Sequence, residues 1–159
     1  MNRSKLNLKR LVLALGSNLG NRMDNIYNAI ILLEELLFLK NIKKSSIIEN
    51  KAMLLPNSPK DWDIYFLNIV ISADIDINNF EPIDILYIIK DIEVKLGRKK
   101  SQKWSPREID IDILAIDDYM IKIDQILNIP HFGIYDRDFF QNGFLEIEPN
   151  LYHKIINQS

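Results

Sequence analysis

The chain has 159 residues and is 47% hydrophobic, which is enough for one domain with a proper core and too little for two. Its formal net charge of -2 is small, so the protein has no global field that would attract nucleic acid or an anionic membrane, and any phosphate site must be local. The absence of Cys excludes disulfides and thiolate metal sites and is compatible with a reducing compartment. We therefore expect a single cytoplasmic domain over 1–159.

The first predicted elements are a buried strand and a helix. Residues 11–15 are continuously apolar, a run shorter than that of a signal peptide, and no later segment approaches a membrane span. The turn-forming residues 16–21 follow, without the Lys and Ser or Thr that end a P-loop. Asn21 and Asp24 are start signals for a helix. Apolar residues then recur at helical spacing, at Ile26, Ile30, Leu33, Leu36 and Leu37.

Two further strands are predicted in the middle of the chain. They cover 45–55 and 66–73, and the segment between them begins with a Pro- and Asn-containing loop at 56–61. Asn68 is the one polar residue in the apolar run that starts the later strand. A buried amide needs hydrogen-bond partners, so Asn68 is either bonded within the fold or contacts a ligand.

The next elements are a helix and a strand. Pro82 suits the first turn of a helix and Gly97 suits the position after its end. Lys90 and Glu93 lie three residues apart on this helix, which indicates a solvated ion pair. The strand at 109–113 follows, and then a turn into 119–123.

The order of these elements, strand, helix, strand, strand, helix, strand, is that of the ferredoxin-like (split βαβ) arrangement. We therefore expect an α+β fold. Its antiparallel sheet should carry helices on one face, and a C-terminal extension should follow.

The strand at 109–113 alternates Ile and Asp, so Asp110 and Asp112 point to one face and the isoleucines to the other. Two carboxylates at this spacing lie roughly 6–7 Å apart and repel each other by about 2–2.5 kcal/mol. A divalent cation would remove that repulsion. Mg²⁺ suits the site, because it takes one or two protein carboxylates and fills its other positions with water and phosphate oxygens.

The segment before this strand favours a phosphate site over an ordinary half-exposed strand. Asp74 and Asp76 have the same alternation without obvious chemistry, so the pair alone would not decide. The loop from Gly97 to Arg107, however, is dense in cations. Cations beside a carboxylate pair suit a polyphosphate that is held by metal on one side and by Arg and Lys on the other.

A second polar group follows Pro130. His131 and Arg137 fall in a loop-like stretch, where long polar side chains can converge on a ligand. A lone His in a loop is more often a surface residue, so both interpretations of His131 stay open at this point.

These landmarks, in this order, resemble the 6-hydroxymethyl-7,8-dihydropterin pyrophosphokinase family over most of the chain. The matching motifs are Leu-Gly-Ser-Asn-Leu-Gly (15–20), Phe-Leu-Asn (66–68), Ile-Glu-x-x-x-Gly-Arg (92–98), Trp-Ser-Pro-Arg-Glu-Ile-Asp-Ile-Asp-Ile (104–113), Pro-His (130–131) and Asp-Arg-Asp-Phe (136–139). The resemblance implies transfer of pyrophosphate from ATP to the hydroxymethyl oxygen of the pterin, with release of AMP, in folate biosynthesis. It also implies two Mg²⁺ ions, and fusion to or association with dihydropteroate synthase is known in such proteins.

The resemblance further implies roles for individual residues. Catalytic roles would fall to Arg98, Arg107, Asp110 and Asp112, of which Asp110 and Asp112 would bind the metal. ATP would contact Glu93, Arg98, Trp104, Arg107, Ile113, His131 and Arg137. The pterin would be stacked between Phe66 and Phe139 and would contact Asn18, Lys51, Ala52, Leu54 and Asn68.

Two other classes of protein remain as alternatives. An RNA-binding ferredoxin-like module would share the element order, but it predicts a basic sheet face with paired aromatic residues. An interaction domain without catalytic activity would not require the charged residues to lie together. The enzyme interpretation therefore requires one set of side chains to converge on a single pocket, namely Arg98, Arg107, Asp110, Asp112, His131 and Arg137.

Overall fold

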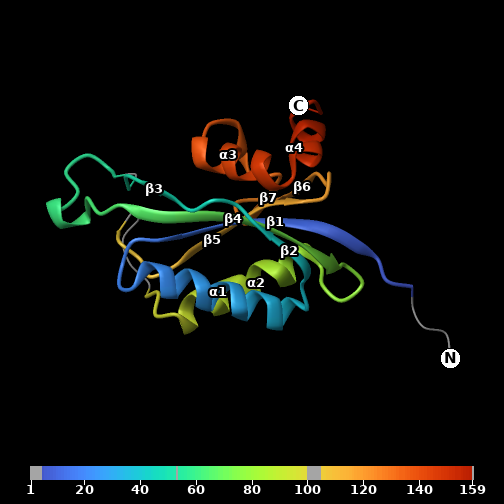
Figure 1. The fold of residues 1–159 in the computed structure, drawn as a ribbon, viewed down its shortest axis with the longest axis horizontal. Coiled ribbons are helices and arrows are strands. Elements are labelled where there is room, and N and C mark those ends of the chain that lie inside the picture. Colours follow the sequence, from blue (N-terminus) through green and yellow to red (C-terminus); the bar gives the residue numbers. More distant parts are fainter. Residues whose placement is uncertain (1–4, 53, 100–104, 159) are drawn as a thin grey trace.

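The structure, a computed structural model, describes residues 5–52, 54–99 and 105–158, so Trp104 lies outside the described residues. Its main element is a five-stranded sheet in which every pairing is antiparallel (Figure 1). The strand order is β2 (Lys40–Lys44), β4 (Phe66–Asp76), β1 (Leu8–Ser17) and β5 (Asp110–Ile116), and β3 (Ile48–Asn50) also pairs with β4. Strands β6 (Ile121–Ile123) and β7 (Leu127–Ile129) form a separate pair. The predicted antiparallel sheet with helices is confirmed.

Helices cover both faces of this sheet, whereas the sequence predicted helices on one face and a C-terminal extension of unspecified structure. In Figure 1, α1 (Arg22–Leu37) and α2 (Pro82–Lys95) lie on one face, and α3 (Asp138–Ile147) and α4 (Pro149–Ile156) lie on the other. Two short 3₁₀ helices, η1 (Lys60–Trp62) and η2 (Phe132–Tyr135), interrupt the connecting loops. The C-terminal extension thus builds a second helical layer. No helix in the described part of the chain is long and apolar enough to cross a membrane.

The two long helices begin and end where their sequences predict. The side chain of Asn21 accepts a hydrogen bond from the Asp24 N–H at 3.1 Å, which satisfies one unpaired donor of the first turn of α1. Pro82 is the first residue of α2. Gly97 follows the end of α2 with φ of +104°, a conformation that a residue without a Cβ adopts at little cost.

The alternation of side chains along β1 divides the interior into two cores. Leu11, Leu13 and Leu15 pack with α1 and α2, whereas Val12 and Ala14 belong to the cluster under α3 and α4. All five side chains are at most 1% exposed, so both faces of the central strand are closed to solvent along this stretch. This double burial explains why the sequence of β1 is continuously apolar and does not alternate with polar residues.

The prediction of one strand over 45–55 is wrong, because the chain forms β2 before it and only β3 within it. Ser45 lies between these two strands, is buried, and accepts a hydrogen bond from the Val70 N–H through its hydroxyl at 2.9 Å. A side chain therefore replaces the backbone partner that a continuous strand would supply at this point. Strand β4 is longer than predicted, since it continues to Asp76.

Candidate active site

The register of the sheet places the predicted pterin and phosphate residues on neighbouring strands. Gly16 in β1 pairs with Asn68 in β4 on one side and with Asp110 in β5 on the other, and Ala14 pairs with Asp112. Strands lie about 4.8 Å apart, so Asn68 and Asp110 are separated by roughly 10 Å across the Gly16 position. All of these residues lie on the sheet face that carries α3.

A cavity of about 530 Å³ opens above this part of the sheet. It is bounded by the ends of β1, β4 and β5, by the segment that follows β3, and by the segment that leads into α3. Its lining residues are Ala14, Leu15, Gly16, Asn50, Lys51, Phe66, Asn68, Arg107, Asp110, Asp112, Phe132, Asp136, Arg137, Asp138 and Phe139. Eight residues predicted from sequence are among them: Lys51, Phe66, Asn68, Arg107, Asp110, Asp112, Arg137 and Phe139.

The predicted alternation of the aspartate strand is confirmed. Ile109, Ile111 and Ile113 are buried in the core against α1 and α2. The side chains of Asp110 and Asp112 are each 31% exposed and face the cavity. The side chain of Ile113 therefore does not line the cavity, so a contact from this residue to ATP would have to come from its backbone.

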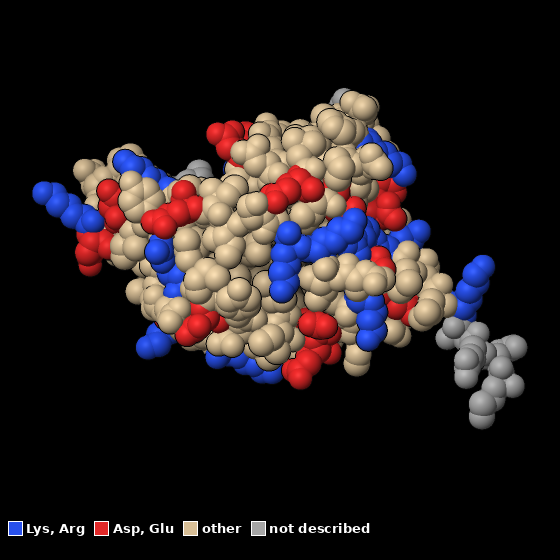
Figure 2. All heavy atoms as spheres, viewed as in Figure 1, with Lys and Arg blue, Asp and Glu red and all other residues tan. Residues whose placement is uncertain are grey.

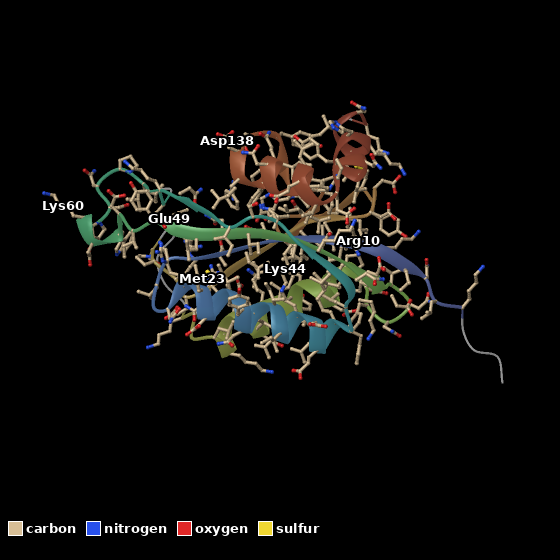
Figure 3. All side chains as sticks on the ribbon, viewed as in Figure 1. Arg10, Met23, Lys44, Glu49, Lys60 and Asp138 are labelled. Carbon is tan, nitrogen blue, oxygen red and sulfur yellow. The ribbon has the colours of Figure 1, made fainter. Side chains whose placement is uncertain are left out.

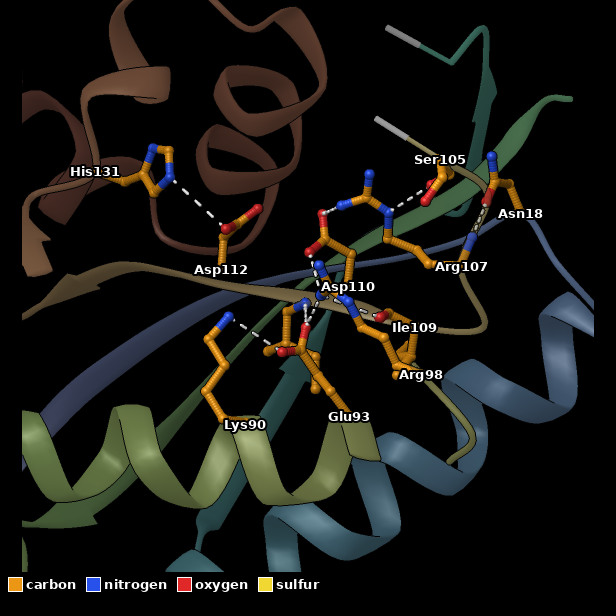
Figure 4. Close-up of polar contacts among 11 residues, drawn as sticks. Asn18, Lys90, Glu93, Arg98, Ser105, Arg107, Ile109, Asp110, Asp112 and His131 are labelled. Carbon is orange, nitrogen blue, oxygen red and sulfur yellow. Dashed lines mark hydrogen bonds and ion pairs between the residues drawn. The ribbon is translucent and has the colours of Figure 1, made fainter. Parts of the chain in front are cut away.

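Cations surround Asp110 (Figure 4). Arg98 Nη1 lies 3.0 Å from Asp110 Oδ1, and Arg107 Nη1 lies 3.7 Å from Asp110 Oδ2. Burial by itself would lower the pKa of Arg98, but Glu93 and Asp110 outweigh that effect and raise it. The Arg98 guanidinium is thus held charged beside the carboxylate.

Asp112 has a different environment from Asp110. Its nearest ionisable partner among the described residues is His131, whose Nε2 lies 3.7 Å from Asp112 Oδ1. Burial and the neighbouring charge of Asp110 raise the pKa of Asp112 to about 7. The protein therefore does not stabilise two full negative charges at this site, and an added cation would do so.

His131 is neutral at pH 7. Burial and the charge of Arg137 lower the pKa of His131 to about 4. Its Nδ1 accepts a hydrogen bond from the Gly133 N–H at 2.9 Å, so the proton of the neutral ring resides on Nε2, facing Asp112. The ring also packs edge-on against Phe140, with centroids 5.3 Å apart. The orientation of the His131 ring is thus fixed, and its Nε2–H is a hydrogen-bond donor beside the cavity. His131 is not an ordinary surface residue.

The interpretation of Lys90 and Glu93 as a solvated pair is wrong. The side chain of Glu93 is only 2% exposed. One of its oxygens accepts from Lys90 Nζ at 3.2 Å, and the other accepts from Arg98 Nη1 at 2.5 Å and from the Ile111 N–H at 3.0 Å. Glu93 therefore joins α2 to β5 and holds Arg98 in place. It is not among the residues that line the cavity, although it was predicted to contact ATP.

The hydrogen bonds of Asn18, like those of Glu93, are made within the protein. It is 3% exposed, and its Oδ1 accepts from the Arg107 N–H at 2.8 Å. Its Nδ2 donates to the carbonyl oxygen of Ile64 at 3.5 Å. Asn18 thus connects the segment that carries Arg107 with the loop that precedes β4, and it is not among the lining residues. Ala52 and Leu54, which were predicted near the pterin, are also outside the lining set.

The six polar side chains required by the enzyme interpretation do converge. Asp110, Asp112, Arg107 and Arg137 line the cavity. The other two contact the carboxylates directly, Arg98 at Asp110 and His131 at Asp112. These residues come from β5, from the loop before it, from the segment after α2 and from the segment before α3, which are far apart in sequence.

Comparison with known proteins identifies the family. A family model described as 7,8-dihydro-6-hydroxymethylpterin-pyrophosphokinase matches residues 12–149. The chain belongs to this family. It is an ATP-dependent pyrophosphokinase that transfers pyrophosphate from ATP to 6-hydroxymethyl-7,8-dihydropterin in folate synthesis and releases AMP.

The similar proteins include both short and long chains. A 2-amino-4-hydroxy-6-hydroxymethyldihydropteridine pyrophosphokinase of Aquifex aeolicus is 43% identical over 143 residues, which are 90% of this chain and 82% of that protein. A folate synthesis bifunctional protein of Chlamydia caviae is 40% identical over 146 residues, but these are only 32% of its length. A wild-type HPPK-DHPS structure of Plasmodium falciparum with pteroate has a TM-score of 0.64 at 16% identity and covers 98% of this chain and 44% of its own, so it supports the fold alone.

Several residues that line the cavity were not predicted from the sequence. Asp136 and Asp138 flank Arg137 in the segment before and at the start of α3, and Phe132 belongs to η2. Asn50 lies at the end of β3. Both aspartates belong to the Asp-Arg-Asp-Phe motif (136–139), which was predicted to supply Arg137 and Phe139 but no aspartate. Nothing in the local pattern of 45–55 indicated Asn50.

Proposed function

We propose that the cavity is the active site of the pyrophosphoryl transfer, with ATP over β5 and the pterin over β4. The observation that carries this proposal is the alignment of Asn68, Gly16 and Asp110 across three adjacent strands. This alignment supports a site with two halves. One half contains aromatic and amide side chains, and the other contains carboxylates and arginines. The hydroxymethyl oxygen would attack the β-phosphorus, the bond from that phosphorus to the α,β-bridging oxygen would break, and AMP would leave.

Asp110 and Asp112 are the proposed ligands of two Mg²⁺ ions. No group of three or more His, Cys, Asp or Glu side chains that could hold a metal is found among the described residues. A pair of carboxylates fits Mg²⁺ nonetheless, since this ion commonly completes its octahedron with water and phosphate oxygens. The raised pKa of Asp112 also fits, because a bound cation would relieve the repulsion from Asp110 that contributes to it. When bound, Mg²⁺ would neutralise charge on the phosphates.

Arginine side chains would stabilise the remaining negative charge of ATP. Arg107 and Arg137 line the cavity directly, and the Arg137 guanidinium lies over the ring of Phe140, 5.1 Å from its centroid. His131 offers a neutral donor to a phosphate oxygen. Arg98 would reach ATP only from beside Asp110, where Glu93 holds it. A contact from Trp104 to ATP stays a prediction.

The pterin would occupy the half of the cavity between β4 and the start of α3. Phe66 and Phe139 line this half from opposite elements, and Phe139 is itself supported edge-on by Phe140 at 4.4 Å. Aromatic stacking suits a flat ring and contributes about 0.5–1.5 kcal/mol per pair beyond area burial. Asn68 is 4% exposed and would contact the polar edge of the ring. Lys51, Ala52 and Leu54 would contribute through the chain that follows β3.

We extend the proposal to the architecture of the chain. The strand order and the element order support a ferredoxin-like sheet, and the family match over 12–149 supports one pyrophosphokinase domain over 1–159. The bifunctional relatives support an association with dihydropteroate synthase. The cytoplasmic location stays a prediction.

The RNA-binding alternative is less well supported. Such a module would need an open sheet face, whereas helices lie on both faces of this sheet. In the view of Figure 2, Lys and Arg gather over β2 but are otherwise mixed with Asp and Glu. The basic residues of β2 are Lys40, Lys43 and Lys44, all at the sheet edge farthest from β5.

The proposal is tested by following AMP formation from ATP, Mg²⁺ and 6-hydroxymethyl-7,8-dihydropterin. Asp112→Asn keeps the shape of the side chain but removes the charge, so we expect loss of most turnover without loss of the folded state. Asp124→Asn, at an exposed aspartate after β6, is the matched control and should behave as the wild type. Wild-type protein that forms no AMP would overturn the assignment of function, and an active Asp112→Asn would overturn the metal site.

A further inference from the structure

Asn50 is a polar residue of the cavity to which none of the roles above is assigned. It ends β3 and lies opposite Phe66 in the register of β3 and β4. In an antiparallel pair, the residue opposite and the residue two positions along the neighbouring strand share one face. Asn50 therefore faces the same side of the sheet as both Phe66 and Asn68, and all three line the cavity.

The two amides are joined to each other. The Nδ2 of Asn68 donates a hydrogen bond to the Oδ1 of Asn50. On its other side, the Oδ1 of Asn68 lies directly over Gly16, where an added Cβ would be only 2.8 Å from that oxygen. Glycine at position 16 therefore leaves room for the amide of Asn68, and Asn50 determines which of its two ends points toward β3.

This arrangement leaves two defined polar atoms for a ligand. With its Nδ2 bonded to Asn50, Asn68 presents Oδ1 as an acceptor, and Asn50 presents its own Nδ2 as a donor, for which no partner occurs among the described residues. The pyrimidine edge of a pterin carries ring and amino N–H donors beside a carbonyl acceptor. An acceptor and a donor on adjacent strands match that edge.

We propose that Asn50 is a further specificity-determining residue of the pyrophosphokinase, which orients Asn68 and donates a hydrogen bond to the pyrimidine carbonyl of the pterin. The inference rests on the proposed placement of the pterin over β4. It differs from that placement in assigning the recognition of the ring edge to two coupled amides rather than to Asn68 alone. A site with paired amides discriminates strongly, because a ring without the matching group leaves a half-buried donor or acceptor unpaired.

Four proteins test this assignment: wild type, Asn50→Ala, Asn68→Ala and the double variant. Titration with 6-hydroxymethyl-7,8-dihydropterin should give a Kd about 10- to 100-fold higher for each single variant, the range for a lost bond that leaves its partner unsatisfied. The double variant should lose less than the product of the two single losses, because the amides act as a unit. The Kd for ATP should change by less than about twofold.

Asn50→Asp separates the proposed donor role from simple packing. Aspartate keeps an acceptor for Asn68 but cannot donate to the ring carbonyl, so its pterin Kd should rise at least as much as that of Asn50→Ala. An analogue without the ring carbonyl should bind wild type and Asn50→Ala about equally. Asn28→Ala, at an exposed position on α1, is the matched control and should bind the pterin as the wild type does.

Several outcomes would overturn the inference. They are an unchanged pterin Kd in Asn50→Ala, full affinity in Asn50→Asp, fully multiplicative losses in the double variant, or equal losses for ATP and pterin together with a lowered melting temperature. If instead the wild type binds the pterin and makes AMP while Asn50→Ala is unaffected, only this inference fails. Wild-type protein that does neither refutes the proposed function itself.

Discussion

The close packing of α3 on the sheet predicts how the second helical layer supports the proposed active site. Gly143 lies where α3 crosses β4, and a Cβ added there would be 2.3 Å from Val70 Cγ2 and 2.7 Å from Val70 Cβ. Carbon atoms in contact prefer about 3.5–4.0 Å, so Gly143→Ala would require a relative displacement of more than about 1 Å.

Helix α3 cannot move away freely. Its Phe140 and Phe144 are fully buried, and the Glu146 carboxylate accepts hydrogen bonds from the backbone and hydroxyl of Ser46 at 2.8–3.0 Å. Overpacking of a core typically costs about 1–3 kcal/mol. For a domain of this size that corresponds to a fall in melting temperature of roughly 2–12 °C.

The same displacement should weaken pterin binding, because α3 carries Phe139. Partial loss of one aromatic stacking contact, about 0.5–1.5 kcal/mol, corresponds to a Kd about 2- to 10-fold higher. Figure 3 shows Asp138 at the start of α3, and the labelled Lys60 lies well away from it at the tip of the loop between β3 and β4. Remote loop positions should therefore not reproduce the effect.

The assay combines thermal melting with pterin titration for Gly143→Ala and for Asn142→Ala. Asn142 is the preceding residue of the same helix and is exposed, so its variant should leave both quantities within error of the wild type. A Gly143→Ala protein with the melting temperature and pterin Kd of the wild type would show that the sheet and α3 can separate at no cost, and would refute the packing argument.

Two further predictions concern charge. Arg107→Ala removes a cation that lines the cavity beside Asp110, so we expect kcat to fall about 10²- to 10³-fold with a smaller change in the Kd for ATP. A raised Kd for ATP with kcat unchanged would show that Arg107 serves ground-state binding alone. The second prediction concerns pH: burial would raise the pKa of Glu148, but hydrogen bonds from Arg10 and Ser72 lower it below its ordinary value of 4.5. A carboxyl whose pKa is lower in the folded state contributes stability above its unfolded pKa and loses it as the pH falls through the folded pKa. The difference in unfolding free energy between wild type and Glu148→Gln should therefore be constant from pH 5 to 7 and shrink below about pH 4.5, and a difference that grew on acidification would contradict this sign.

The sequence by itself determined the elements whose residues carry a complete local signal. The cap at Asn21, the proline and glycine that bound α2, and the helical spacing of apolar residues identified both long helices. Alternation of Ile and Asp in β5 identified which side chains face the core and which face the cavity. These features depend on residues close together in the chain, where backbone geometry alone decides which face a side chain occupies.

Only the tertiary structure decided what each polar side chain contacts. The sequence predicts that Glu93 is a solvated residue on a helix, yet its contacts with β5 and Arg98 bury it. Asn18 reads as part of a turn, yet it connects Arg107 with the loop before β4.

Asn50 belongs to the cavity because β3 pairs with β4 at that register. In each case the partner comes from a distant part of the chain. A short run of sequence specifies the direction of a side chain but not the residue that will lie across from it, because that residue is set by sheet register and helix packing.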